Sequence, residues 1–172
     1  MHIVNNHGGK LPIRIKAVKE GTKVANHNVL MFIEPTDPDC FWLTNYIETL
    51  LMKVWYPTTI ATHSYLAKQK ILEYLELTGT PESIDFRLHD ISYRSCTSEE
   101  QAIIGAMSHL VHFMGTDAVA GVWGAREIYS TCEMVAFSVP ASEHSVVLSF
   151  GDKENEVDYF RNMLNLYPTG IV

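Results

Sequence analysis

Three stretches of the sequence place polar side chains directly after apolar runs. Asp90 and Arg94 follow "IDFRL", Asp117 closes the triplet "GTD" before a run of small residues, and His144 lies in "SVPASEHS" after "EMVAF". An arginine offers a planar fork for phosphate, an aspartate accepts hydrogen bonds from an amide, and a histidine titrates near neutral pH. Together these groups suit a pair of small ligands, one anionic and one bearing an amide.

Each of these residues also has a purely structural interpretation. Arginines and acids at strand ends commonly form loop salt bridges, and an aspartate before a helix, such as Asp117, is commonly an N-cap. His144 could simply bond to its neighbour Glu143. His109 and His112 lie about one turn apart on a predicted helix with no third ligand nearby, so a partly solvated helix face is favoured over a metal site.

The start of the chain is typical of a two-stranded ribbon. Ile13, Ile15 and Val18 alternate in "LPIRIKAV", and "NVLMFIE" is a short apolar run, so we expect two strands joined through a turn at Gly21. A ribbon of this size needs a covering element, which the next segment can supply.

Residues 37–57 predict one long helix that begins at Asp37 and Pro38 and stops at Pro57. Its expected core-facing stripe is Leu43, Tyr46, Ile47, Leu50, Leu51 and Val54. A second helix is expected over residues 64–77, ending at Gly79 and Pro81, and residues 84–90 are typical of a strand. The tryptophans Trp42, Trp55 and Trp123 and the seven methionines are expected in the core.

Two further helices are expected around the middle of the chain. Ser98 and Gln101 form a capping-box pattern, and the predicted buried side of the helix carries Ile103, Met107, Leu110, Val111 and Met114. The next helix is expected to start at Asp117. Its small residues should allow close packing against a neighbour; they are Ala118, Gly121, Gly124 and Ala125.

The last part of the chain continues the alternation of strands and helices. Residues 133–140 and 145–150 are typical of strands, and residues 152–168 predict a helix with acids in its first turn. This order favours an α/β fold with a parallel sheet or part of a barrel. Ligand sites in such folds lie at the carboxyl ends of the strands, where the polar residues described above are found.

Composition narrows the class of protein. The chain has 172 residues, of which 47% are hydrophobic and 19% charged, which suits one globular domain with a strand-rich part, 1–35, and a helix-rich, barrel-like part, 36–172. A net charge of −7 without a basic run argues against nucleic-acid binding. Three widely spaced cysteines fit reduced thiols, and neither a membrane span nor a leader is visible, so we expect a cytoplasmic protein.

Five segments taken together resemble nicotinamide phosphoribosyltransferase, in order and with compatible spacing. They are "LPIRIKAVKEG", "TDPDCFWLTNYIETLLMKVWYP", "LHDISYRS", "GAMSHLVHFMGTDAVAG" and "FSVPASEHS". Related nicotinate enzymes typically lack the acid that this chain keeps at Asp117. A carboxylate accepts hydrogen bonds from a carboxamide and repels a substrate carboxylate, which makes the nicotinamide enzyme the better match.

The resemblance implies a partial type II phosphoribosyltransferase fold with an incomplete α/β barrel. It implies transfer of phosphoribose from phosphoribosyl pyrophosphate, with Mg²⁺, to nicotinamide, giving nicotinamide mononucleotide for NAD synthesis, with ATP as a possible activator. His144 would be the catalytic residue. The substrate-binding residues implied are Asp90, Ile91, Arg94, Asp117, Ser138, Val139 and Ala141.

The chain departs from the family pattern in two ways. Ile91 stands where the family has a phenylalanine that stacks on the nicotinamide ring, and Ser92 and Ser95 replace glycines. Family members also extend beyond both ends of this sequence, so we expect a central segment that is inactive without a complementary chain or a homodimer partner. The alternative is a non-catalytic homologue that binds a partner or a pyridine ligand. Nothing here matches the glycine fingerprint of a general NAD-binding module.

Overall fold

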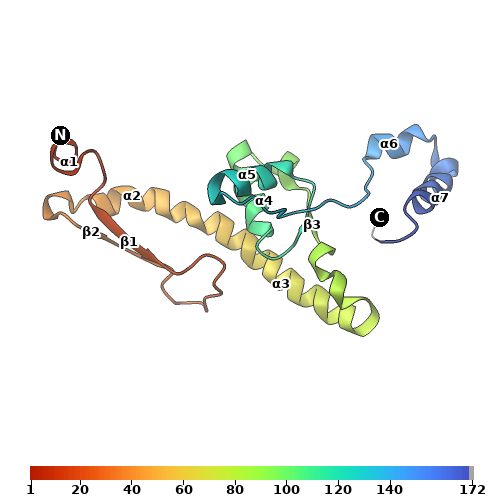
Figure 1. Ribbon diagram of the computed structural model, residues 1–172, viewed down its shortest axis with the longest axis horizontal. Coiled ribbons are helices and arrows are strands. Elements are labelled where there is room, and N and C mark those ends of the chain that lie inside the picture. The colour runs from red at the N-terminus through yellow and green to blue at the C-terminus, as the bar shows by residue number, and fades with distance from the viewer. Residues whose placement is uncertain (171–172) are drawn as a thin grey trace. The chain divides into compact units, whose positions relative to one another are not determined.

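A computed structural model describes residues 1–170, which form two compact units (Figure 1). The first unit is Met1–Thr58, and the second begins at Thr59. The boundary falls inside a helix rather than after residue 35, where the strand-rich part was expected to end. That the two units belong to one domain stays a prediction.

The first unit contains the predicted ribbon. Strands β1 (Ile13–Ala17) and β2 (Met31–Pro35) pair antiparallel, with Ile13 opposite Pro35 and Ala17 opposite Met31. Gly21 takes a φ of 77° in the connecting loop, a left-handed conformation that costs glycine little. A short helix that the sequence pattern did not predict, α1 (His2–His7), precedes the ribbon.

The predicted helix over residues 37–57 is real, but its packing and its end differ from expectation. A 3₁₀ turn, η1 (Pro38–Cys40), starts at Asp37, whose carboxylate accepts the Asp39 N–H at 2.9 Å. It is followed by α2 (Leu43–Leu51) and η2 (Met52–Val54). The long helix α3 (Trp55–Thr78) then begins before Pro57. The expected stop is wrong because Pro57 lies in the first turn of α3, where its missing N–H has no helical partner to lose.

The expected core stripe on α2 is wrong for most of its members. Leu43 is 1% exposed, whereas Tyr46 is 74% and Leu50 62% exposed. A two-stranded sheet offers too little area to cover a whole helix face, so only the residues nearest the turn are buried. The tryptophans are likewise not core residues: Trp42, Trp55 and Trp123 are all about half exposed or more, as are several methionines, including Met52 and Met134.

The second unit places parallel segments side by side. After α3 it continues with η3 (Pro81–Phe86), β3 (His89–Asp90), η4 (Ser92–Ser95), α4 (Glu99–His109), β4 (Gly115–Thr116) and α5 (Val119–Tyr129). Strands β3 and β4 are parallel, with Asp90 opposite Thr116, and a parallel bridge joins Gly115 to Phe137. The mixed helix-and-strand class is thus confirmed. The strand expected over 84–90 shrinks to two residues because Pro81 starts a 3₁₀ helix instead.

The close packing predicted from the small residues is confirmed between α4 and α5. A Cβ at Gly121 would lie 2.5 Å from the Cβ of Ala106, and one at Gly124 would lie 2.4 Å from Cγ2 of Ile103. The side of α4 that is buried differs from expectation: it carries Ala102, Gly105, Ala106, Ser108 and His109. Small residues are needed there because the backbone of α5 lies so close. The Ser98 cap is confirmed, since its Oγ accepts the Gln101 N–H at 3.1 Å.

The last part of the chain is more helical than predicted. Residues 145–150 form α6 (His144–Ser149) instead of a strand, because the Glu143 carboxylate caps it by accepting the Ser145 N–H at 2.7 Å. Residues 133–140 contribute a single bridge at Phe137. The final predicted helix is confirmed as η5 (Lys153–Asn155) and α7 (Glu156–Leu166), with Glu156 and Asp158 in the first turn of α7. Within residues 1–170, no helix has both the length and the apolar character needed to cross a membrane.

Candidate functional site

The ends of β3 and β4 are joined by a small network of hydrogen bonds. The Asp117 N–H and the Thr116 hydroxyl both donate to the carbonyl of Asp90, at 2.9 and 3.2 Å. The Thr116 hydroxyl in turn accepts the Ala118 N–H at 3.0 Å, and Thr116 is only 5% exposed. This buried threonine therefore fixes the turn that carries Asp117 beside the exit of β3.

Asp117 presents an exposed carboxylate whose orientation is set by a third segment. The Ser138 hydroxyl donates to Oδ1 of Asp117 at 2.6 Å. The N-cap interpretation of Asp117 is wrong, because α5 begins at Val119 and its cap position is Ala118. Asp90, Asp117 and Ser138 come from three separate parts of the sequence and lie together.

Two polar atoms next to this network have no hydrogen-bond partner among the residues that the structure describes. They are Oδ2 of Asp90 and Nε2 of His89, both buried. The other carboxylate oxygen of Asp90 accepts the Ser92 N–H at 3.0 Å. A buried polar atom without a partner costs about 1–3 kcal/mol, so such atoms mark places where a ligand or another segment can supply a bond.

Ile91 precedes the exposed turn η4, and Arg94 lies within it. Ile91 is 59% exposed, and Arg94 is exposed and forms no hydrogen bond or ion pair within residues 1–170. The loop salt bridge considered for this arginine is therefore not present. A guanidinium without a protein partner keeps its full donor capacity for an anion.

His144 is not brought to Asp117 by any contact in the described part of the chain. Its side chain is 81% exposed, and its Nδ1 lies 3.2 Å from the carboxylate of the adjacent Glu143. The pKa of Glu143 is lowered to about 2, first by the Ser145 hydroxyl, then by the Ser145 N–H and by His144. The local pairing that was the structural alternative for His144 is thus the one observed. Val139 is half-buried and Ala141 exposed on the segment between Ser138 and α6.

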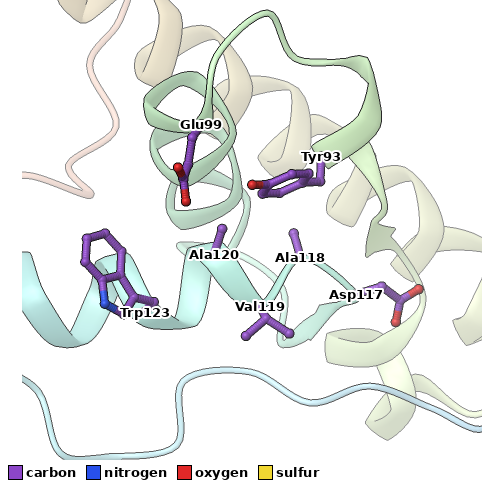
Figure 2. Close-up of a pocket in the computed structure, with 7 residues that line it drawn as sticks. All are labelled: Tyr93, Glu99, Asp117, Ala118, Val119, Ala120 and Trp123. Carbon is purple, nitrogen blue, oxygen red and sulfur yellow. The ribbon is translucent and has the colours of Figure 1, made fainter.

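A pocket of about 530 Å³ opens beside the start of α5 (Figure 2). Its lining residues are Tyr93, Glu99, Asp117, Ala118, Val119, Ala120 and Trp123. Figure 2 shows the Asp117 carboxylate pointing away from Glu99 and Trp123, while Tyr93 lies above Ala118. Of the predicted site residues only Asp117 lines this pocket. Asp117 is therefore the residue that the pocket and the Asp90–Asp117–Ser138 network have in common.

One supporting residue was missed by the sequence interpretation. His109 is 6% exposed. Its Nδ1 is hydrogen-bonded to the Ser64 hydroxyl at 2.9 Å, and its Nε2 is hydrogen-bonded to the Leu88 carbonyl at 3.1 Å. A neutral ring that donates from Nε2 and accepts at Nδ1 satisfies both bonds. The expectation of a partly solvated face is wrong for His109, because its bonds tie α4 to α3 and to the residue just before β3. No local signal reveals this, since Ser64 is 45 positions away.

Part of the chain matches a known protein family. Residues 86–166 match the model of the "Nicotinate phosphoribosyltransferase (NAPRTase) family". Those residues include β3, β4, α5 and the Ser138 segment, which together form the network described above. Over those residues the chain is similar to this family of phosphoribosyltransferases.

The chain is also similar to proteins named nicotinamide phosphoribosyltransferase. It is 47% identical to the one from Xanthomonas campestris pv. campestris (strain 8004), a match that covers 99% of this chain and 37% of the relative. It is 39% identical to that of Acinetobacter baylyi, over 95% of this chain and 33% of the relative. It is 30% identical to that of Mycoplasma pneumoniae, over 92% of this chain and 34% of the relative. The chain thus spans about a third of the length of the relatives it matches.

Proposed function

We propose that this chain forms the nicotinamide-binding part of a phosphoribosyltransferase that makes nicotinamide mononucleotide and pyrophosphate for NAD synthesis. The single observation that carries the proposal is the Asp117 carboxylate, held by Ser138 at the exit of two parallel strands in a chain 47% identical to a nicotinamide phosphoribosyltransferase. The same resemblance supports a type II phosphoribosyltransferase fold, of which β3, β4 and the Phe137 bridge are parallel elements.

Asp117 suits recognition of an amide. One carboxylate oxygen accepts from Ser138, which leaves the other oxygen to accept from the NH₂ of a carboxamide. The carboxylate of nicotinate would meet a like charge at the same position, and that repulsion selects against the acid. Ile91, which is exposed and directly follows Asp90 in the sequence, can cover a ring face, although without the quadrupole of an aromatic side chain.

Arg94 suits the anionic substrate. During phosphoribosyl transfer, positive charge develops on the sugar and negative charge on the departing pyrophosphate. A guanidinium that has no protein partner can bind a phosphate oxygen pair without first breaking an ion pair. His144, accessible on α6, is proposed as the catalytic residue on the strength of the family pattern.

Among the described residues we identify no binding site for Mg²⁺ or ATP. Mg²⁺ prefers an octahedron of oxygen ligands and is usually bound through substrate phosphates and only one or two carboxylates. Two carboxylates near the strand exits already accept hydrogen bonds from protein donors: Asp90 accepts the Ser92 N–H, and Asp117 accepts the Ser138 hydroxyl. We therefore expect Mg²⁺ to arrive with phosphoribosyl pyrophosphate, and we derive no step of the reaction through it.

The proposal is tested by complementation. The chain is mixed with a second chain that carries the segments of the Xanthomonas relative outside the matched region; this mixture is called the complemented transferase. Nicotinamide, phosphoribosyl pyrophosphate, Mg²⁺ and ATP are supplied, and nicotinamide mononucleotide is measured. Product is expected from the complemented transferase and not from either chain alone. The absence of product, together with no binding of nicotinamide to the chain, would refute the proposed function.

A further inference from the structure

A second group of chemically active side chains lies in the first unit, apart from the strand exits. One ring nitrogen of His2, one carboxylate oxygen of Asp37 and Sγ of Cys40 all lie within 4.8 Å of one another. His2 comes from α1, and the other two residues come from the turn that follows β2. None of the three takes part in the proposed transfer of phosphoribose.

The central carboxylate of this group is firmly positioned. Oδ1 of Asp37 accepts the Asp39 N–H at 2.9 Å, and Oδ2 accepts from Nε2 of His2 at 2.7 Å and from Nε2 of His7 at 2.6 Å. Cys40 is 1% exposed, and its thiol is not part of a disulfide. The His2 side chain is 39% exposed, which leaves a route from solvent to the three ligand atoms.

We propose that His2, Asp37 and Cys40 bind a Zn²⁺ ion, with His7 hydrogen-bonded to the ligating carboxylate and a water in the fourth position. The donor set suits this ion, because one imidazole nitrogen, one carboxylate oxygen and one thiolate sulfur are the three ligand types that Zn²⁺ takes in proteins. Mg²⁺ and Ca²⁺ prefer oxygen ligands only and do not suit Cys40. The bond from His7 is the kind of outer contact that orients a ligating carboxylate.

The metal-free geometry needs only a small adjustment. Ligand atoms bonded to one tetrahedral zinc at about 2.0–2.3 Å lie roughly 3.3–3.8 Å apart, so His2 must retreat from Asp37 by roughly 1 Å. Helix α1 is short and has no buried residue, so this shift displaces little packing. Nδ1 of His2 now accepts from the Asn6 amide at 3.0 Å. When Nε2 binds a metal, Nδ1 carries the proton, and rotation of the Asn6 amide presents its oxygen as acceptor.

The experiment is a titration of the tag-free chain with Co²⁺, followed by competition between Zn²⁺ and a chromophoric chelator. We expect one ion per chain, a thiolate-to-cobalt charge-transfer band and the intense visible bands of a tetrahedral site. Cys40→Ser should abolish the charge-transfer band. His2→Gln should weaken Zn²⁺ binding more than a hundredfold, and His7→Gln about tenfold, because partners of ligands contribute about 10–100-fold.

Controls separate this site from adventitious binding. Cys132→Ser removes an exposed free thiol, and His63→Gln removes an exposed histidine on α3; both should bind like the parent chain. Circular dichroism of each variant checks folding, and Asp37→Asn, which keeps the shape of the side chain, provides a second test if Cys40→Ser fails to fold. A charge-transfer band that survives Cys40→Ser, or affinity unchanged by both His2→Gln and Asp37→Asn, would overturn the proposal and leave a hydrogen-bonded cluster only.

Discussion

The Ser138 hydroxyl donates a hydrogen bond to Oδ1 of Asp117 at 2.6 Å, across 21 positions of sequence. This bond gives the two oxygens of the carboxylate different environments. Oδ1 accepts a hydrogen bond from Ser138, whereas Oδ2 accepts none within residues 1–170, and the residue is exposed. The arrangement turns a flexible acid into an acceptor with a set direction, which is what discrimination between an amide and an acid requires.

Asp117→Asn is expected to relax the preference for nicotinamide over nicotinate in the complemented transferase. The neutral amide removes the charge repulsion, and hydrogen bonds to charged groups are worth about 1.5–3 kcal/mol, so the ratio of kcat/KM values should fall about tenfold to a hundredfold. Glu99→Gln is the matched control, because it removes a carboxylate from the same pocket on the side away from Asp117. An unchanged ratio in Asp117→Asn would remove this residue from the recognition role.

Arg94→Ala is expected to raise KM for phosphoribosyl pyrophosphate about tenfold to a hundredfold in the complemented transferase, because a charge-assisted contact to phosphate is lost. Arg94→Lys should recover only part of the loss, since an ammonium cannot bind two oxygens in a planar fork. Arg126→Ala, an exposed arginine on α5, is the control and should leave KM unchanged. Equal KM values for all three variants would show that Arg94 does not contact the phosphates.

Gly121→Ala is expected to destabilise the chain even though alanine is the better helix former by about 1 kcal/mol. The new methyl group would lie 2.5 Å from the Cβ of Ala106, and overpacking of this kind costs about 1–3 kcal/mol, so the packing effect should win. Urea unfolding measures the change. Ala106→Gly removes the clash but itself costs about 1 kcal/mol as a glycine inside α4, so Gly121→Ala should cost less stability in the Ala106→Gly background than in the parent chain. The same cost of Gly121→Ala in both backgrounds would mean that α4 and α5 move apart easily.

The sequence was sufficient where the determinant is local. The Ser98 cap and the acids in the first turn of α7 each depend on residues within a few positions of one another, and both are confirmed. The small residues of α5 also predicted close packing, because only glycine and alanine allow helix backbones to approach so closely.

The sequence was insufficient where a structural feature depends on residues far apart in the chain or on how much surface a neighbouring element can cover. Pro57 was expected to end a helix, yet a proline is compatible with the first turn of α3, where it lies. Residues 145–150 read as a strand because of Val146, Val147 and Leu148, but the Glu143 cap starts a helix there. For the candidate site, the strand exits placed Asp90 and Asp117 together, whereas the bond from Ser138 and the support from His109 arise only from the folded chain.

The stability of the chain is expected to fall as the pH drops below about 6.5, and His109 is the residue responsible. Burial lowers the pKa of His109 below 6.5, its ordinary value, in spite of the bond to the Leu88 carbonyl and the nearby Asp90 carboxylate, which act in the opposite direction. In the unfolded chain the ring binds a proton as the pH passes 6.5, but in the folded chain it does so only at lower pH. The stabilisation is therefore complete above 6.5 and is lost progressively toward the folded pKa.

The measurement is the urea midpoint at about pH 7.5 and about pH 5.5, on either side of the ordinary histidine pKa. His109→Gln should be less stable at both values, because the bonds to Ser64 and Leu88 are weakened, but its midpoint should change less between them than that of the parent chain. His63→Gln, an exposed histidine on the adjoining helix, should keep the parent's pH dependence. If His109→Gln retains the full dependence, another group is responsible and the buried ring is not the one that titrates.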